Sequence, residues 1–406
     1  MTFNSILSNL TIVCLSYERQ NFIRRQLAYF HSFPTKIIFA DGSLVHLGIN
    51  YQASIGQLEW KYLHIPGAGT YVERCMAALD IVDTDYVCLM DDADVMLASG
   101  LKLAVRELDE NKDLLFAGGK VGSFSSSDGL LSFGVWGHWT NSFSIEMEDP
   151  VKRLISTIES VRTANLYYVV VRTVEFRDLM GKVLGIKFSY NAASELLLTG
   201  LLAVNSKYKI GDYPFWMRGD EPSVDPKLYH KCGRVDWDRK FPEELMYLKR
   251  TLADALVNQG VLPDIAFSSI EEYLEIHYQQ SLKIHCQESL GLDAAAEYYK
   301  GYQKNLKSSL RKLLDIKIYD IVKYLLVNPY RFVKSFVSME QVFSHSPLEL
   351  GQIHCLEFWQ IHCGELSNEQ RSDLLDVAHL LKQFPRGIQT NQALFDYLGI
   401  PYLQSN

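Results

Sequence analysis

Short apolar runs alternate with segments of helical spacing over the first 125 residues, and this alternation limits the possible folds more than any other feature. The runs expected to form strands are 10–15, 36–40, 60–65 and 86–90, and the segments expected to form helices between them are 21–29 and 71–82. Strands that alternate with helices favour a mostly parallel sheet connected by crossover helices. We therefore predict an α/β, Rossmann-like fold for this part of the chain.

Acidic residues follow two of the predicted strands directly. Asp41 comes after the strand at 36–40, and the run Asp91-Asp92-Ala93-Asp94 comes after the strand at 86–90. In a parallel sheet, polar residues at the carboxyl ends of the strands face a common ligand crevice. The sequence thus predicts a binding site at this edge of the sheet.

The rest of the chain is mainly helical in character. Helical spacing recurs at 173–184 and 192–205, and the Gly- and Ser-rich stretch 123–137 is expected to be a loop that closes over substrate. A polar, Pro-containing stretch at 219–242 suggests a boundary. With 406 residues the chain is long enough for two cores. We predict one domain at 1–235, which contains the binding site at the edge of the sheet, and a helical domain at 236–406.

Charge and cysteine usage narrow the functional class. A net charge of -8 argues against a general nucleic-acid binder, which gains affinity from a basic surface. The seven cysteines are scattered without CxxC spacing, and the N-terminal residues do not read as a signal peptide, so a cytoplasmic protein is expected. No apolar run is long enough to span a membrane. The basic, amphipathic segment 299–334 suggests peripheral attachment to the anionic inner face of the cell membrane, or else a solvated helical face or a protein-contact surface.

The acidic run indicates a divalent metal site. At least two carboxylates are expected to lie close together there, and their repulsion requires a counter-charge. Hard oxygen ligands favour Mg²⁺ or Mn²⁺ over zinc, and such an ion would neutralise a diphosphate leaving group. The alternative is a solvated acidic turn that caps the following helix.

Several segments in the same order resemble the family-2-like glycosyltransferases of GT-A fold. The segment 11–19 is similar to the family's first strand and turn, 36–43 to its second strand, and 85–94 (DYVCLMDDAD) to its DxD segment. The resemblance spans about residues 10 to 223. It implies a metal-dependent transferase that uses a nucleotide-sugar donor.

The resemblance also implies roles for individual residues on the donor side. Asp92 and Asp94 form the DxD pair, with Asp94 the metal ligand, Asp92 nearer the ribose, and Asp91 the alternative in register. Asp41 is placed to hold the nucleobase, although Asp-Gly-Ser is also a good turn without a ligand. The residues expected to border the donor further are Tyr17 and Arg74.

Two more residues complete the expected site. Glu195, at the start of a helical run, is similar to the family's general base for inverting transfer, but Ser194 stands where an acidic residue is usual. A Glu in a first helical turn also complements the helix dipole. Arg218 is placed to grip the diphosphate, or else to pair with Asp220 or Glu221. Glu18 is a second departure from the family's pattern, because Asn is more usual at this position.

The leading hypothesis is therefore sugar transfer from a nucleotide-sugar to a glycan or lipid-linked acceptor, with a place in bacterial surface polysaccharide biosynthesis implied only by the resemblance. One alternative is a nucleotidyltransferase that makes nucleotide sugars, although such enzymes usually carry a Gly-rich phosphate loop and residues 16–25 contain no glycine. The other is a non-catalytic sugar- or protein-binding module on the same fold, which Glu18 and Ser194 would favour.

Overall fold

The computed structural model describes twelve stretches of the chain. They are 6–49, 55–67, 70–127, 130–135, 143–160, 166, 168–189, 191–219, 241–280, 355–356, 358–360 and 362–399. By internal contacts the chain divides into one unit of Met1–His277 with Gly351–Asn406 and a second of Tyr278–Leu350. The predicted domain boundary at 235/236 and the basic segment 299–334 lie outside the described residues, so both stay predictions.

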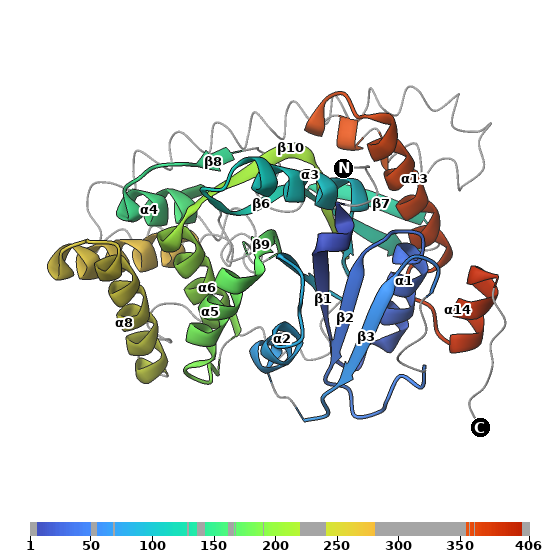
Figure 1. Cartoon of the computed structure of the whole chain (residues 1–406), viewed down its shortest axis with the longest axis horizontal. Helices are drawn as coiled ribbons and strands as arrows, with labels where there is room; N and C mark the ends of the chain where they lie inside the picture. Colours follow the sequence, from blue (N-terminus) through green and yellow to red (C-terminus); the bar gives the residue numbers. More distant parts are fainter. Residues whose placement is uncertain are drawn as a thin grey trace, which may run out of the picture. The chain divides into compact units, whose positions relative to one another are not determined.

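The described strands form one mixed, mostly parallel sheet in the order β3-β2-β1-β4-β9-β6-β10-β5, with β7 beside β6 and β8 beside β10 (Figure 1). Their bounds are β1 Leu10–Ser16, β2 Lys36–Asp41, β3 Glu59–His64, β4 Tyr86–Asp91, β5 Val95–Met96, β6 Leu114–Ser127, β7 Leu130–Val135, β8 Phe143–Ile145, β9 Val170–Arg172 and β10 Lys207–Gly219. Neighbouring strands β1 to β4, and β6 with β10, pair in parallel, whereas β9 is antiparallel to both β4 and β6. The predicted α/β class is confirmed.

Helices connect the strands and cover the sheet. They are α1 Gln20–Phe30, α2 Tyr71–Leu79, α3 Ala98–Glu110, α4 Pro150–Ser160, α5 Thr173–Leu184, α6 Asn191–Asn205, α8 Pro242–Asn258, α13 Asn368–Gln383 and α14 Asn391–Leu398. The strands β1 and β4 are buried along nearly their whole length. Because parallel strands covered on both faces are buried on both sides, their sequences are continuous apolar runs. This is why the sequence pattern located them to within one residue.

The Gly- and Ser-rich stretch 123–137 is not the loop that composition suggested. Its first residues continue β6, and β7 returns antiparallel to it, with Gly122 opposite Val135 and Ser127 opposite Leu130. Backbone hydrogen bonding to the neighbouring strand thus outweighs the weak strand preference of Gly and Ser. The prediction of a closing loop over these residues is wrong.

The C-terminal helices α13 and α14 pack against α1 and α3, within the unit that contains the sheet. Apolar residues of α13 recur at helical spacing, so that Leu374, Val377 and Leu381 lie on one face of the helix and in the buried core. In the part of the chain that the structure describes, we find no helix with the length and apolar character needed to cross a membrane.

Candidate functional site at the carboxyl ends of the strands

Strand register brings the predicted acidic residues to one edge of the sheet. Ser16 pairs with Asp41 across β1 and β2, and Leu15 pairs with Asp91 across β1 and β4. Parallel pairing therefore places the ends of β1, β2 and β4 at the same level. This confirms that Asp41 and the acidic run share an edge, as the sequence pattern predicted.

The acidic run forms a tight turn between β4 and β5, which we call the acidic turn (residues 91–94). The N–H of Asp94 donates to the carbonyl of Asp91 at 3.2 Å. Strand β5 then pairs antiparallel with β10, Met96 opposite Trp216. The turn is thus held at both ends by the sheet.

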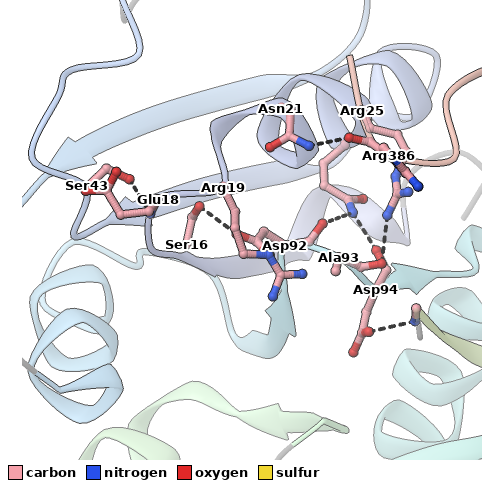
Figure 2. A network of polar contacts seen from close by, with 12 residues as sticks. Ser16, Glu18, Arg19, Asn21, Arg25, Ser43, Asp92, Ala93, Asp94 and Arg386 are labelled. Carbon is pink, nitrogen blue, oxygen red and sulfur yellow. Dashed lines mark hydrogen bonds and ion pairs between the residues drawn. The ribbon is translucent and has the colours of Figure 1, made fainter. Parts of the chain in front are cut away.

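Asp92 points into the protein, where two partners engage its carboxylate (Figure 2). The Ser16 hydroxyl donates to Oδ2 at 2.7 Å, and Arg19 Nε lies 3.1 Å from Oδ1. The counter-charge that the sequence led us to expect from a metal is therefore supplied, for Asp92, by an arginine of the protein itself.

Asp94 is also buried, and β10 supplies its partners. The Trp216 indole N–H donates to one carboxylate oxygen at 2.8 Å, and the Gly219 backbone N–H donates to the other at 3.0 Å. Arg218 lies between Trp216 and Gly219 in the sequence and is half-buried. Its positive charge favours the ionised form of Asp94. The predicted rivals for Arg218, Asp220 and Glu221, lie outside the described residues.

Burial and mutual repulsion dominate the electrostatics of the acidic turn. Burial first, and the neighbouring Asp91 second, raise the pKa of both Asp92 and Asp94. The charge of Arg19 acts in the opposite direction on the pKa of Asp92, and that of Arg218 does so for Asp94. Burial and the charge of Asp91 thus disfavour the ionised form of both carboxylates, whereas the two arginines favour it.

Asp91 differs from its two neighbours. It is half-buried, and within the described part of the chain its carboxylate accepts no hydrogen bond from a protein donor outside the acidic turn. The described residues contain no group of three or more His, Cys, Asp or Glu arranged around one ion position. A site with one or two carboxylates suits Mg²⁺ or Mn²⁺ bound jointly with substrate phosphates, which usually supply further ligands.

Asp41 is fully buried and accepts four hydrogen bonds from the protein. The backbone N–H of Ser43 and its hydroxyl donate to Oδ1, whereas the Gln20 amide and the Tyr62 hydroxyl donate to Oδ2 at 2.8 and 2.7 Å. This carboxylate therefore ties α1, β3 and the turn after β2 together. Its contact with a nucleobase stays a prediction.

Tyr17 and Arg74 lie together beside this turn. The Arg74 guanidinium sits 5.7 Å from the centroid of the Tyr17 ring, which is 42% exposed. Gly42 lies against both side chains, since a Cβ at this position would come within 3.1 Å of each. Arg74 is itself buried and is attracted to Asp41, Asp92 and Asp91. The structure thus brings these two predicted residues to the same edge as the acidic turn.

Glu18 has a left-handed backbone conformation, with φ at 55°. Asn and Gly adopt this region more readily than other residues, which gives a physical reason for the family's usual Asn. Here the Glu18 N–H donates to the Ser43 hydroxyl at 2.7 Å, and its side chain accepts from Leu44 N–H at 2.7 Å. These local bonds stabilise the conformation without Asn.

The candidate base Glu195 is half-buried in α6, but it lies beyond the first turn of this helix, which begins at Asn191. The alternative that Glu195 complements the helix dipole from the first turn is therefore wrong. Its neighbour Ser194 is buried and its hydroxyl accepts from the Tyr71 hydroxyl at 3.0 Å. Burial, and then the charge of Glu195, raise the pKa of Tyr71. Because Tyr71 and Arg74 lie one turn apart on α2, this helix connects the start of α6 with the acidic turn.

Two cavities bear on these assignments. One of about 110 Å³ lies between the start of α2 and the start of α6, lined in part by Thr70, Phe188 and Ser194, so it adjoins the candidate base. A larger one of about 460 Å³ lies against the first half of β2 and most of β3, lined in part by Lys36 and Trp60. None of the predicted donor-site residues lines that larger cavity.

Sequence reasoning missed several residues that shape the acidic turn. They are Ser16, Arg19, Arg25, Gln26 and Trp216. Of these, Ser16 and Arg19 carried a usable signal, because they lie at the end of a strand that faces the predicted crevice and in the turn that follows it. The others are common core or helix residues whose partners lie in distant parts of the sequence.

Known proteins share little sequence with this chain. No protein-family model matches the chain, and no curated protein matches its sequence. Among solved structures, residues 1–349 of S. aureus TarS align at 16% identity and a TM-score of 0.43, over 70% of this chain and 76% of that one. The same part of TarS in complex with UDP-GlcNAc aligns at 17% identity and 0.44, with the same coverage. Its complex with UDP aligns at 15% and 0.41, over 93% and 91%. Identity and TM-score are both low, so these likenesses carry no argument about the activity of this chain.

Proposed function

We propose that this protein is a nucleotide-sugar-dependent glycosyltransferase of GT-A type, whose donor site lies at the carboxyl ends of β1, β2 and β4. One observation carries the proposal: strand register and side-chain contacts assemble the acidic turn, Tyr17 and Arg74 at a single edge. The family resemblance read in the sequence requires this assembly. The acceptor is a glycan or a lipid-linked glycan.

The acidic turn binds a divalent cation together with the donor diphosphate. Asp94, oriented by Trp216 and Gly219, and Asp91, whose carboxylate is open, would hold the ion. When bound, Mn²⁺ or Mg²⁺ would neutralise charge on the departing diphosphate. Asp92, fixed by Ser16 and Arg19, borders the ribose.

Other residues bind the donor and activate the acceptor. Tyr17 stacks on the nucleobase with its exposed ring, and Arg74 and Arg218 supply positive charge toward the diphosphate. Glu195 accepts the proton of the acceptor hydroxyl as the anomeric carbon is attacked from the opposite face, so the transfer inverts configuration.

A donor-hydrolysis screen with a panel of nucleotide sugars and Mn²⁺ tests this function. We expect turnover with at least one donor, lost on chelation and in Asp94→Ala. Formation of nucleotide sugar from a sugar phosphate and a nucleoside triphosphate would favour the nucleotidyltransferase alternative. Donor binding without turnover or transfer would favour the binding module, for which Ser194 in place of an acidic residue is the supporting observation.

A further inference from the structure

Two buried side chains of α1 donate hydrogen bonds to the backbone carbonyls of the acidic turn. Arg25 donates from Nη2 to the carbonyl of Ala93 at 2.7 Å, and Gln26 donates from Nε2 to the carbonyl of Asp92 at 2.8 Å and also to that of Asp94 (Figure 2). Arg25 has no exposed surface, and its guanidinium packs on the ring of Phe22 at 4.8 Å. The conformation of the turn is therefore set by α1 as well as by the sheet.

The same guanidinium also binds the C-terminal part of the chain. Arg25 donates from Nη1 to the carbonyl of Pro385 at 3.1 Å. A planar guanidinium fixes its two acceptors relative to one another, so Pro385 and Ala93 are coupled through one rigid group. The segment that follows is fastened to α1 by Asn21, which donates to the carbonyl of Arg386 and accepts from Ile388 N–H at 2.8 Å.

A second contact joins the C-terminal part to the other end of the turn. Asp373 of α13 is buried and accepts from the N–H and the hydroxyl of Ser99, at 2.8 and 2.7 Å, in the first turn of α3. The Tyr29 hydroxyl donates to the same carboxylate and accepts from Ala98 N–H at 3.0 Å. A carboxylate at this place satisfies free N–H groups of the helix and complements its dipole. Helix α3 begins four residues after Asp94.

We propose that Asp373 and residues 385–391, here called the C-terminal clamp, are a positioning element of the donor site. The clamp holds the acidic turn from both sides, through Arg25 and through the start of α3, so that repelling carboxylates keep the geometry that a cation and a diphosphate require. The functional part of this inference rests on the proposed glycosyltransferase activity, whereas the mechanical coupling does not.

A pair of glycine substitutions tests the clamp at a distance from the site. Gly387 and Gly399 both have left-handed φ angles, of +77° and +67°. A Cβ at Gly387 would come within 2.5 Å of the Asn21 carbonyl oxygen, whereas no atom of the described residues lies within 4 Å of one at Gly399. Gly387→Ala and Gly399→Ala thus share the backbone strain, but only the first forces the clamp away from α1.

Hydrogen exchange and kinetics are measured on both full-length variants. We expect Gly387→Ala to raise amide exchange in residues 91–97 at least about tenfold and to lower kcat for donor hydrolysis about tenfold. Gly399→Ala should keep the wild-type values for both. Equal exchange of 91–97 in the two variants would overturn the coupling. Raised exchange with unchanged kcat and donor KM would overturn the positioning role.

A second variant covers failure of Gly387→Ala to fold. Arg25→Lys keeps the buried charge but replaces the planar fork by one ammonium, so the two carbonyls are no longer coupled rigidly. We expect amide exchange to rise in residues 91–97 and to stay unchanged in α14. Wild-type exchange in residues 91–97 would contradict the proposal. Absence of donor turnover in the wild type would defeat the proposed function alone, because the exchange comparison needs no substrate.

Discussion

The ends of β2 and β4 both carry buried aspartates, yet the protein treats the two regions differently. At the end of β2, Asp41 has all its acceptor capacity used by Ser43, Gln20 and Tyr62. At the end of β4, three carboxylates share few donors, and Asp91 accepts no hydrogen bond from a described donor outside the acidic turn. A carboxylate whose hydrogen bonds are all made within the protein stabilises the framework. Three neighbouring carboxylates that share few donors are better suited to bind a cation. Substitutions can test this contrast.

The largest expected effect is on the β4 side. Asp91→Asn keeps the shape of the side chain and removes the charge of a carboxylate that accepts no hydrogen bond from a described donor outside the acidic turn. We expect donor turnover to fall by about a hundredfold to a thousandfold, with little change in the midpoint of thermal unfolding. Asp85→Asn, at the exposed opposite end of β4, is the matched control and should retain full turnover. Equal turnover in both variants would contradict the contrast.

Glu195→Gln tests the acceptor side of the same site. Loss of a general base should lower kcat by about a hundredfold while donor KM stays within about twofold of the wild type. The control is Glu175→Gln, which removes the charge of an exposed Glu in the first turn of the neighbouring helix α5. If both variants keep wild-type kcat, Glu195 is not the general base and that role belongs to another residue.

Asp41→Asn should act mainly on stability. The new amide group would face donors that now point at the carboxylate, leaving buried donors without an acceptor. We expect the free energy of unfolding to fall by about 2 to 4 kcal/mol, measured by chemical denaturation. Asp83→Asn removes an exposed ion pair with Lys36 and should cost less than about 1 kcal/mol. Wild-type stability of Asp41→Asn together with a raised donor KM would show instead that Asp41 binds the nucleobase.

The smallest effect is expected at Tyr17. Removing the exposed ring in Tyr17→Ala should raise donor KM about tenfold through lost stacking, which is worth about 1 to 3 kcal/mol per base. Tyr17→Phe keeps the ring and should leave donor KM near the wild-type value. A tenfold rise in both variants would point to the hydroxyl rather than to stacking.

The sequence predicted the sheet around the site well, and the reason is physical. Strands β1, β2 and β4 are buried on both faces, so their continuous apolar runs are visible without knowledge of the fold. Strand β3 lies at the edge of the sheet, and its first four residues alternate between exposed and buried. The β6–β7 hairpin was missed because Gly and Ser give no such signal. The bonding of Asp41 was also hidden, since Gln20 and Tyr62 reach it from separate elements. The clamp joins residues as far apart in sequence as Arg25 and Pro385, and no local pattern encodes such a contact.

Binding of Mn²⁺ at the acidic turn tests the central claim most directly, because it needs neither the correct sugar nor the acceptor. The free Mn²⁺ signal in electron paramagnetic resonance would be titrated with wild type, Asp91→Asn and Asp85→Asn, each with UDP, GDP, CDP or TDP. We predict one bound ion per wild-type chain with at least one of these nucleotides, affinity about tenfold or more weaker in Asp91→Asn, and wild-type affinity in Asp85→Asn. Equal affinity in all three proteins, or no binding by the wild type with any of the nucleotides, would contradict the account.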